Sequence, residues 1–275
     1  MSRLRSIEII TLGICLLLSA GCVSGAVYHP ARTIRSTPAD AKLIYEDVSL
    51  ETSDKVRISG WWIPAAQPRG TVLFCHGNAG NIGDRLDTYL AINALGFNTF
   101  AFDYRGYGTS GGSPSEDGTY EDADAAWNYL VATQGISPQH IIIWGRSLGG
   151  AIAARTAAYH RAGLVIVESS FTSVKELAKD LCWWVPSFLL ARYTYDTRGY
   201  LQRIDVPVLV IHSADDEIIT FHHGETLYKS INGQKEFLRI RGSHNHGFID
   251  SMSVYVSSIN KFINRYAQQK EAILE

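Results

Sequence analysis

The sequence predicts an α/β fold in which helices cover both faces of a mostly parallel central sheet. Short apolar runs alternate with helical stretches along most of the chain, as they do in proteins built on parallel sheets. Several of these runs, such as residues 71–75 and 141–144, are continuously apolar, which is typical of strands buried on both faces. With 275 residues, of which 46% are apolar and 19% charged, the chain is long enough for one large domain with its own core.

The expected elements follow one another in a regular order. Apolar and polar residues alternate in 47–51 and 56–63, on either side of a polar turn, which predicts an antiparallel hairpin. Further strands are expected at 71–75, 97–102, 141–144, 164–167, 206–212 and 235–240, and helices at about 82–95, 115–133, 151–158 and 248–267. Ligands bind such sheets at the carboxyl ends of the strands, so the polar loops that follow the strands are expected to converge on one crevice.

The N-terminal residues are expected to be a targeting signal rather than part of the fold. Arg3 and Arg5 precede an apolar stretch at 9–18, which is short for a permanent membrane helix and leads into small residues before Cys22. This arrangement resembles a bacterial lipoprotein signal, so residues 1–21 are expected to be a signal peptide and Cys22 the lipidated mature N-terminus. The alternatives are an ordinary signal peptide cleaved near Gly25 and a short uncleaved anchor.

Beyond the signal, the chain divides into a tether and one domain. Several acyl chains on Cys22 would anchor the protein firmly, and the absence of an aspartate just after the cysteine favours the outer membrane by the same resemblance. Residues 22–45 have mixed, unperiodic composition and are expected to be an N-terminal tether, which leaves 46–275 as the folded α/β domain. The domain would be lipid-anchored and face the periplasm.

Ser147 is a candidate nucleophile. Residues 145–149 (GRSLG) match the G-x-S-x-G pattern, which describes a tight turn from a strand into a helix with a strained serine at its tip. An apolar run precedes this turn and helix-compatible residues follow it at 151–158. The N-terminus of that helix would stabilise negative charge beside the serine. The alternative interpretation is a buried structural turn.

A serine nucleophile needs a histidine base that is oriented by a carboxylate. On this kind of sheet the acid and then the histidine follow the serine along the chain. His244, between the last strand and the last helix, is the preferred base, and His246 is the fallback. Asp216, after the strand at 206–212, is the preferred acid. The other carboxylates considered for this role are Asp215, Glu217 and Glu168.

Acyl transfer also requires donors for the negative oxygen of a tetrahedral intermediate. The backbone N–H of Leu148, directly after the nucleophile, is expected to be one of them. The second is expected from Asn78, in the loop 76–81 that follows an earlier strand. The alternative for this loop is a simple turn before a helix.

Several motifs in register resemble the α/β-hydrolases of the fungal bud-emergence type. They are HGNAGN at 76–81, DYRGYG at 103–108, GRSLGG at 145–150, ESSFTS at 168–173 and GSHN at 242–245. The resemblance runs from about residue 47 to the C-terminal helix. It implies an α/β-hydrolase fold, a triad of Ser147, Asp216 and His244, and an oxyanion hole from Asn78 and Leu148. The family's animal members include acyl-protein thioesterases.

Residues 176–202 contain an aromatic stretch where caps over such sites are usually inserted. We expect a small apolar cap, with Trp183 and Trp184 shaping an acyl pocket. The alternative is that these aromatic side chains pack a helix onto the sheet.

The predicted function is hydrolysis of a small-molecule carboxylic ester or thioester through an acyl-enzyme intermediate. The alternatives are a serine peptidase or amidase on the same scaffold and a non-catalytic envelope protein that binds a ligand. No cofactor or metal is expected, the metal alternative being a site among His244, His246, Asp215 and Asp216. The net charge of −2 and the scattered basic residues give no reason to expect nucleic acid as a partner.

Overall fold

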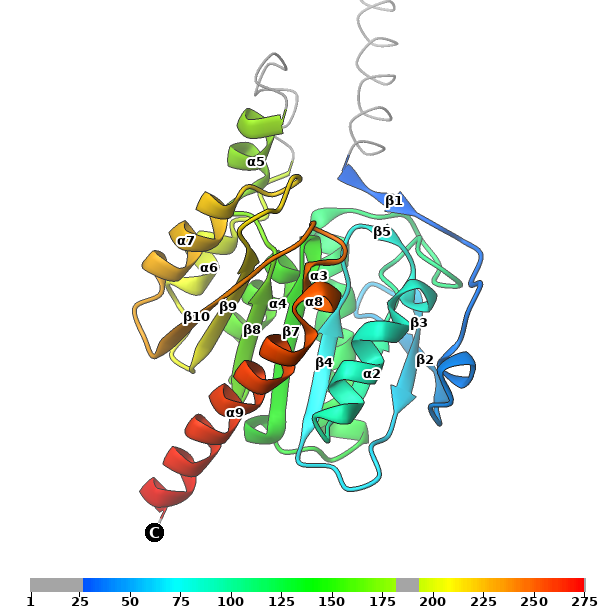
Figure 1. Ribbon diagram of the computed structural model, residues 1–275. Coiled ribbons are helices and arrows are strands. Elements are labelled where there is room, and N and C mark those ends of the chain that lie inside the picture. The colour runs from blue at the N-terminus through cyan, green and yellow to red at the C-terminus, as the bar shows by residue number, and fades with distance from the viewer. Residues whose placement is uncertain (1–26, 182–192, 275) are drawn as a thin grey trace, which may run out of the picture.

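The structure is a computed structural model that describes residues 27–181 and 193–274 (Figure 1). Its main sheet consists of β2 (Glu46–Glu51), β3 (Arg57–Ile63), β4 (Thr71–Cys75), β6 (Asn98–Phe102), β7 (Ile141–Arg146), β8 (Leu164–Glu168), β9 (Val208–Ser213) and β10 (Lys235–Ile240). The expected hairpin is β2 and β3, paired antiparallel from Glu46 opposite Trp62 to Glu51 opposite Arg57. Every expected strand is present, with bounds shifted by up to two residues.

The strands lie in the order β10-β9-β8-β7-β4-β6-β3-β2. All neighbouring pairs from β10 to β6 are parallel, whereas β3 is antiparallel to both β6 and β2. The central strands β4, β8 and β9 are buried along their whole length, as their continuous apolar runs predict. The structure thus confirms the predicted fold class.

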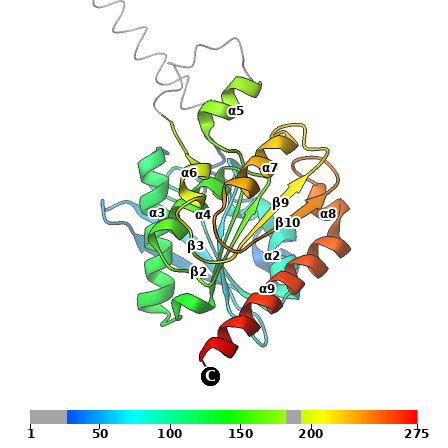
Figure 2. The ribbon, with the colours of Figure 1, turned by 90° about the vertical axis from the view of Figure 1, so that its left-hand side faces the viewer.

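Helices cover both faces of this sheet (Figures 1 and 2). One face carries α3 (Glu116–Asn128), α4 (Leu148–Tyr159), α6 (Thr197–Leu201) and α7 (Phe221–Ser230), and the other carries α2 (Leu86–Ala94), α8 (Gly247–Asp250) and α9 (Met252–Leu274). Each face has its own apolar core, so the sheet is packed on both sides. A π-helical turn, η3 (Tyr129–Thr133), extends α3, and short 3₁₀ turns lie at η1 (Pro38–Ala41), η2 (Ile82–Arg85) and η4 (Pro138–His140).

The helix α5 (Val174–Leu181) stands beyond the carboxyl ends of the strands, at the position of the expected cap (Figure 1). Its first residue, Val174, is buried, and its backbone N–H donates to the carbonyl of Thr194. Trp183 and Trp184, on which the cap prediction depends, lie outside the described residues, as do the predicted signal peptide and Cys22. None of the helices within the described ranges is long and apolar enough to cross a membrane.

The described part of the expected tether, residues 27–45, is packed on the domain. The short strand β1 (His29–Pro30) runs parallel to β5 (Ala79–Gly80). Tyr28 is only 4% exposed, and its hydroxyl lies 2.7 Å from that of Tyr195. Within the expected tether, residues 27–45 therefore contact the domain, while the tether itself stays a prediction. The segment is held by scattered single contacts, such as the buried ring of Tyr28 and the bonds of Asn81 to the carbonyls of Ala31 and Thr33, which leave no apolar periodicity from which its packing can be predicted.

Candidate active site

Side chains from three separate loops meet at the carboxyl edge of the sheet. Ser147 lies between β7 and α4, Asp216 follows β9, and His244 follows β10. The Nε2 atom of His244 lies 3.2 Å from Ser147 Oγ, and its Nδ1 atom lies 2.8 Å from Asp216 Oδ2. The structure thus brings the three residues of the predicted triad into one hydrogen-bonded chain. In this arrangement a histidine can accept a serine proton while a carboxylate fixes its tautomer.

The backbone at Ser147 is strained. Its φ of 56° and ψ of −121° lie in a region that residues with a side chain rarely adopt, at a cost of about 1–3 kcal/mol. Hydrogen bonds to the end of β8 hold this conformation. The N–H of Ser147 donates to the carbonyl of Glu168 at 2.9 Å, and its carbonyl accepts from the hydroxyl of Ser170 at 2.9 Å.

The glycines of the motif let α4 approach the sheet closely. A Cβ atom at Gly145 would lie 2.0 Å from the carbonyl oxygen of Gly149, and one at Gly149 would lie 1.9 Å from that of Cys75. Both contacts are with backbone, which cannot move aside as a flexible side chain does. The glycine spacing of the motif therefore follows from how tightly the helix packs against β4 and β7.

The carboxylate of Asp216 is buried and fully engaged. Its Oδ1 atom accepts from the backbone N–H groups of Ile218, at 3.0 Å, and Ile219, at 2.8 Å, while Oδ2 faces His244. Burial acts to raise the pKa of Asp216. The hydrogen bond to His244, the electrostatic attraction of the His244 ring and the two backbone N–H groups outweigh burial and bring the pKa of Asp216 below its ordinary value. Asp216 is therefore ionised at neutral pH, which keeps the proton of neutral His244 on Nδ1 and leaves Nε2 free to accept.

The loop that carries His244 is anchored from two sides. The backbone N–H of His244 donates to Glu217 Oε2 at 3.0 Å. From the other side, the guanidinium of Arg146 donates to the carbonyls of His244, at 2.8 Å, and Asn245, at 2.9 Å, and lies over the ring of Phe248. Sequence reasoning missed the part played by Arg146 and Glu217. Arg146 fills a variable position of the serine motif, and its contact is made about a hundred residues further along the chain.

The other residues considered for the triad are engaged elsewhere. Asp215 pairs with Arg241 at 3.2 Å, and the Glu168 carboxylate accepts from the hydroxyl of Tyr255 at 2.7 Å. His246 directly precedes α8 as its N-terminal capping residue, and its side chain is exposed.

The loop after β4 lies beside Ser147. A Cβ atom at Gly77 would come within 3.4 Å of the Cβ of Ser147, so the backbone just before Asn78 borders the nucleophile. Leu148 is the first residue of α4, and the N–H groups of the first helical turn have no acceptor within their own helix. The two residues predicted to donate to an oxyanion thus belong to adjoining segments beside Ser147.

The side chain of Asn78 fastens this loop to the rest of the domain. Its Oδ1 atom accepts from the hydroxyl of Tyr107 and from the backbone N–H of His29, both at 3.0 Å. The second donor belongs to β1. The N-terminal segment therefore contacts the loop that borders the nucleophile.

Comparison with known proteins places this arrangement in a family. The sequence model for serine aminopeptidase S33 matches residues 66–196, and the model for PhoPQ-activated pathogenicity-related protein matches 186–273. The α/β-hydrolase domain-containing protein WAV2 of Arabidopsis thaliana is 34% identical over 256 residues, which cover 85% of this chain and 83% of that protein. The chain belongs to the α/β-hydrolases.

Other relatives of this α/β-hydrolase are also similar over most of their length. An uncharacterized protein of Mycobacterium tuberculosis is 32% identical over 224 residues, or 80% of each chain. Among solved structures, an esterase of Pyrococcus furiosus superposes with a TM-score of 0.74 at 21% identity, over 88% of this chain and 98% of the esterase. That superposition confirms the α/β-hydrolase fold.

Proposed function

We propose that this α/β-hydrolase cleaves carboxylic esters or thioesters through Ser147, His244 and Asp216. The observation that carries the proposal is the continuous hydrogen-bonded chain from Ser147 Oγ through both nitrogens of His244 to a buried, ionised Asp216. The strained serine at the start of α4 supports it, since that turn presents the hydroxyl next to free helical N–H groups. On its five motifs, we assign the chain to the fungal bud-emergence type.

The reaction follows from this geometry. His244 Nε2 takes the proton of Ser147 as Oγ attacks the acyl carbon, and the N–H groups of Leu148 and Asn78 stabilise the resulting oxyanion. Collapse of this intermediate breaks the bond to the alcohol or thiol, which leaves with the proton from His244. Water then attacks the acyl-enzyme with His244 again as base, which releases the acid and restores Ser147.

A serine peptidase or amidase is the second candidate, because the family model that matches residues 66–196 is described as a serine aminopeptidase. The same three residues support that reaction, with an amine as the leaving group.

We further propose that Cys22 is lipidated and that the enzyme is held at the outer membrane, facing the periplasm. The contacts of His29 support a short connection between an anchor at Cys22 and the loop of Asn78. Cys22 and His29 are seven residues apart, a span of at most about 25 Å, and the N–H of His29 contacts Asn78. An anchor at Cys22 therefore keeps the oxyanion loop near the bilayer, which favours an amphiphilic acyl substrate.

The test of the catalytic proposal is labelling of the purified full-length protein by a fluorophosphonate probe. We expect labelling of the wild type and its loss in Ser147→Ala, together with hydrolysis of p-nitrophenyl acetate, butyrate and palmitate. A panel of amino-acid p-nitroanilides separates the esterase from the peptidase. A folded wild-type protein that takes no label would overturn the assignment of the triad and favour a ligand-binding role.

The anchor is tested separately by metabolic labelling with radioactive palmitate. We expect label in the outer-membrane fraction for the wild type and none for Cys22→Ser. Equal labelling of the two proteins would refute lipidation at Cys22.

A further inference from the structure

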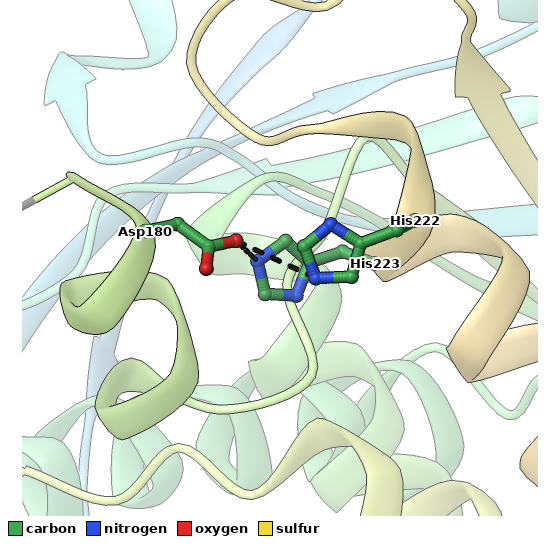
Figure 3. Close-up of side chains that lie close together, drawn as sticks. All are labelled: Asp180, His222 and His223. Carbon is green, nitrogen blue, oxygen red and sulfur yellow. Dashed lines mark ion pairs between the residues drawn. The ribbon is translucent and has the colours of Figure 1, made fainter.

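A second cluster of polar side chains lies where α5 meets the start of α7. Asp180 comes from the last turn of α5, and His222 and His223 come from the first turn of α7. Figure 3 shows both imidazole rings turned toward the Asp180 carboxylate. The potential ligand atoms of the three side chains all lie within 4.8 Å of one another. No residue of the triad belongs to this cluster.

The spacing of the cluster suits a small metal ion. Asp180 Oδ2 lies 3.1 Å from His223 Nε2 and 3.4 Å from His222 Nε2. Ligand atoms at the usual zinc distances in a tetrahedron are about 3.4 Å apart. Each nitrogen therefore lies from the carboxylate oxygen at about the distance that separates two ligands of one ion, and all three atoms are within 4.8 Å of one another.

A buried polar atom is directed into this space. His223 is fully buried, and its Nε2 atom has no hydrogen-bond partner within the described residues. Asp180 Oδ2 is close to it, but the direction of approach does not meet hydrogen-bond geometry. Leaving a buried polar atom unpaired is costly, and coordination of a metal ion would satisfy it.

The opposite side of each ring is held by a hydroxyl. His222 Nδ1 lies 2.7 Å from Thr220 Oγ1, and His223 Nδ1 lies 2.9 Å from Thr172 Oγ1. The backbone N–H of Thr172 donates to His223 Nδ1 at 3.2 Å, so in the metal-free protein the proton of neutral His223 is on Nε2. The Thr220 hydroxyl can accept from Nδ1–H of His222, which leaves Nε2 of that ring free to bind a metal, as outer partners of metal-bound histidines do. At His223, metal binding requires the proton to move from Nε2 to Nδ1, where the Thr172 hydroxyl can accept from it.

We propose that Asp180, His222 and His223 form a binding site for a divalent transition-metal ion, of which Zn²⁺ fits best. Two imidazoles and one carboxylate are a ligand set that zinc accepts, with a fourth position left for water. The ion would fasten α5 to the first turn of α7, which directly follows the loop of Asp216. No metal is predicted from the sequence, which contains no cysteine-rich or H-E-x-x-H pattern. Asp180 lies more than forty residues before the histidine pair, so their meeting leaves no local spacing from which it can be predicted.

The experiment measures zinc binding by the full-length protein in detergent after removal of metals with EDTA. We expect isothermal titration to give one Zn²⁺ per chain, and the melting temperature to rise with added Zn²⁺. Asp180→Asn and His222→Gln, both at exposed positions, should each weaken binding at least tenfold while the metal-free melting temperature stays close to that of the wild type. The absorption spectrum of bound Co²⁺ reports the coordination geometry.

Two controls distinguish this site from other histidines. His140→Gln, at an exposed position before β7, should bind Zn²⁺ as the wild type does. His244→Ala should also retain binding, since the proposed site excludes the triad. Failure of the wild type to bind one Zn²⁺, or unchanged affinity in Asp180→Asn and His222→Gln, would overturn the proposal. Because binding is measured directly, the outcome is independent of whether the protein is a hydrolase.

Discussion

Ser147 and Asn78 hold their positions for different reasons. Ser147 is kept in a strained conformation by hydrogen bonds from the end of β8, so its geometry depends on a neighbouring strand. Asn78 is proposed to act through its backbone N–H, while its side chain accepts from Tyr107 and His29. The side chain would then position the donor without touching the substrate.

Asn78→Ala tests whether the Asn78 side chain only positions the backbone donor. We expect kcat for p-nitrophenyl butyrate to fall roughly tenfold with little change in KM, because the backbone donor remains but its loop is less well fixed. Steady-state kinetics measure the effect, and Asn128→Ala, at an exposed position in α3, is the matched control. Unchanged turnover in Asn78→Ala would favour the alternative of a simple turn before a helix.

The N-terminal segment shows how an element without periodicity becomes part of the domain. β1 adds two residues beside β5, and Tyr28 fills a pocket that Tyr193 and Tyr195 border. The Tyr195 hydroxyl bonds to that of Tyr28 and, at 2.9 Å, to Thr119 of α3. The segment is thereby fixed to the loop of Asn78 and, through Tyr195, to α3 on one face of the sheet.

Tyr28→Ala should destabilise the protein by about 3 kcal/mol, as expected when a buried aromatic ring is removed. Urea unfolding followed by circular dichroism measures this loss. Ile44→Ala is the control, since Ile44 belongs to the same segment but is 77% exposed. Equal stability of the two variants would mean that residues 27–45 contribute no more than a tether.

At the scale of the molecule, the strand order determines where the loops meet. The chain passes from β4 to β6 on one side and then to β7 on the other, so β4 lies at a reversal of strand order. Loops that leave neighbouring strands in opposite directions open a crevice at the carboxyl edge. The loops of Asn78 and Ser147 leave these strands, while those of Asp216 and His244 reach the same edge from β9 and β10.

A buried histidine makes the stability of the whole fold depend on pH. His212 is fully buried, and its Nε2–H donates to the carbonyl of Ile219 at 2.8 Å. Burial lowers the pKa of His212 below its ordinary value of 6.5. Below about pH 6.5, His212 therefore binds a proton in the unfolded chain but not in the folded protein, so the free energy of unfolding falls with decreasing pH. Above about pH 6.5, His212 is neutral in both states and the free energy of unfolding does not depend on this group.

We expect the free energy of unfolding to be nearly constant between pH 7 and 8 and to fall between pH 6.5 and 5, by up to about 1.4 kcal/mol per pH unit from this one group. Urea unfolding at several pH values measures the slope. His212→Gln retains a donor near the position of Nε2, and its free energy of unfolding should fall less steeply with decreasing pH than that of the wild type. The control His140→Gln, at an exposed position, should show the slope of the wild type. Identical slopes in the wild type and His212→Gln would contradict this explanation.

The sequence by itself determined the alternation of buried strands and helices, because apolar periodicity records which faces are covered. It also indicated the strained serine, through glycines whose places no side chain can fill, and a chain order of serine, acid and histidine. Only the tertiary structure decided that Arg146 and Glu217 anchor the histidine loop, that residues 27–45 pack on the domain, and that Asp180 meets His222 and His223. These contacts join single residues far apart in the chain, and a contact between single residues produces no periodic pattern from which it can be predicted.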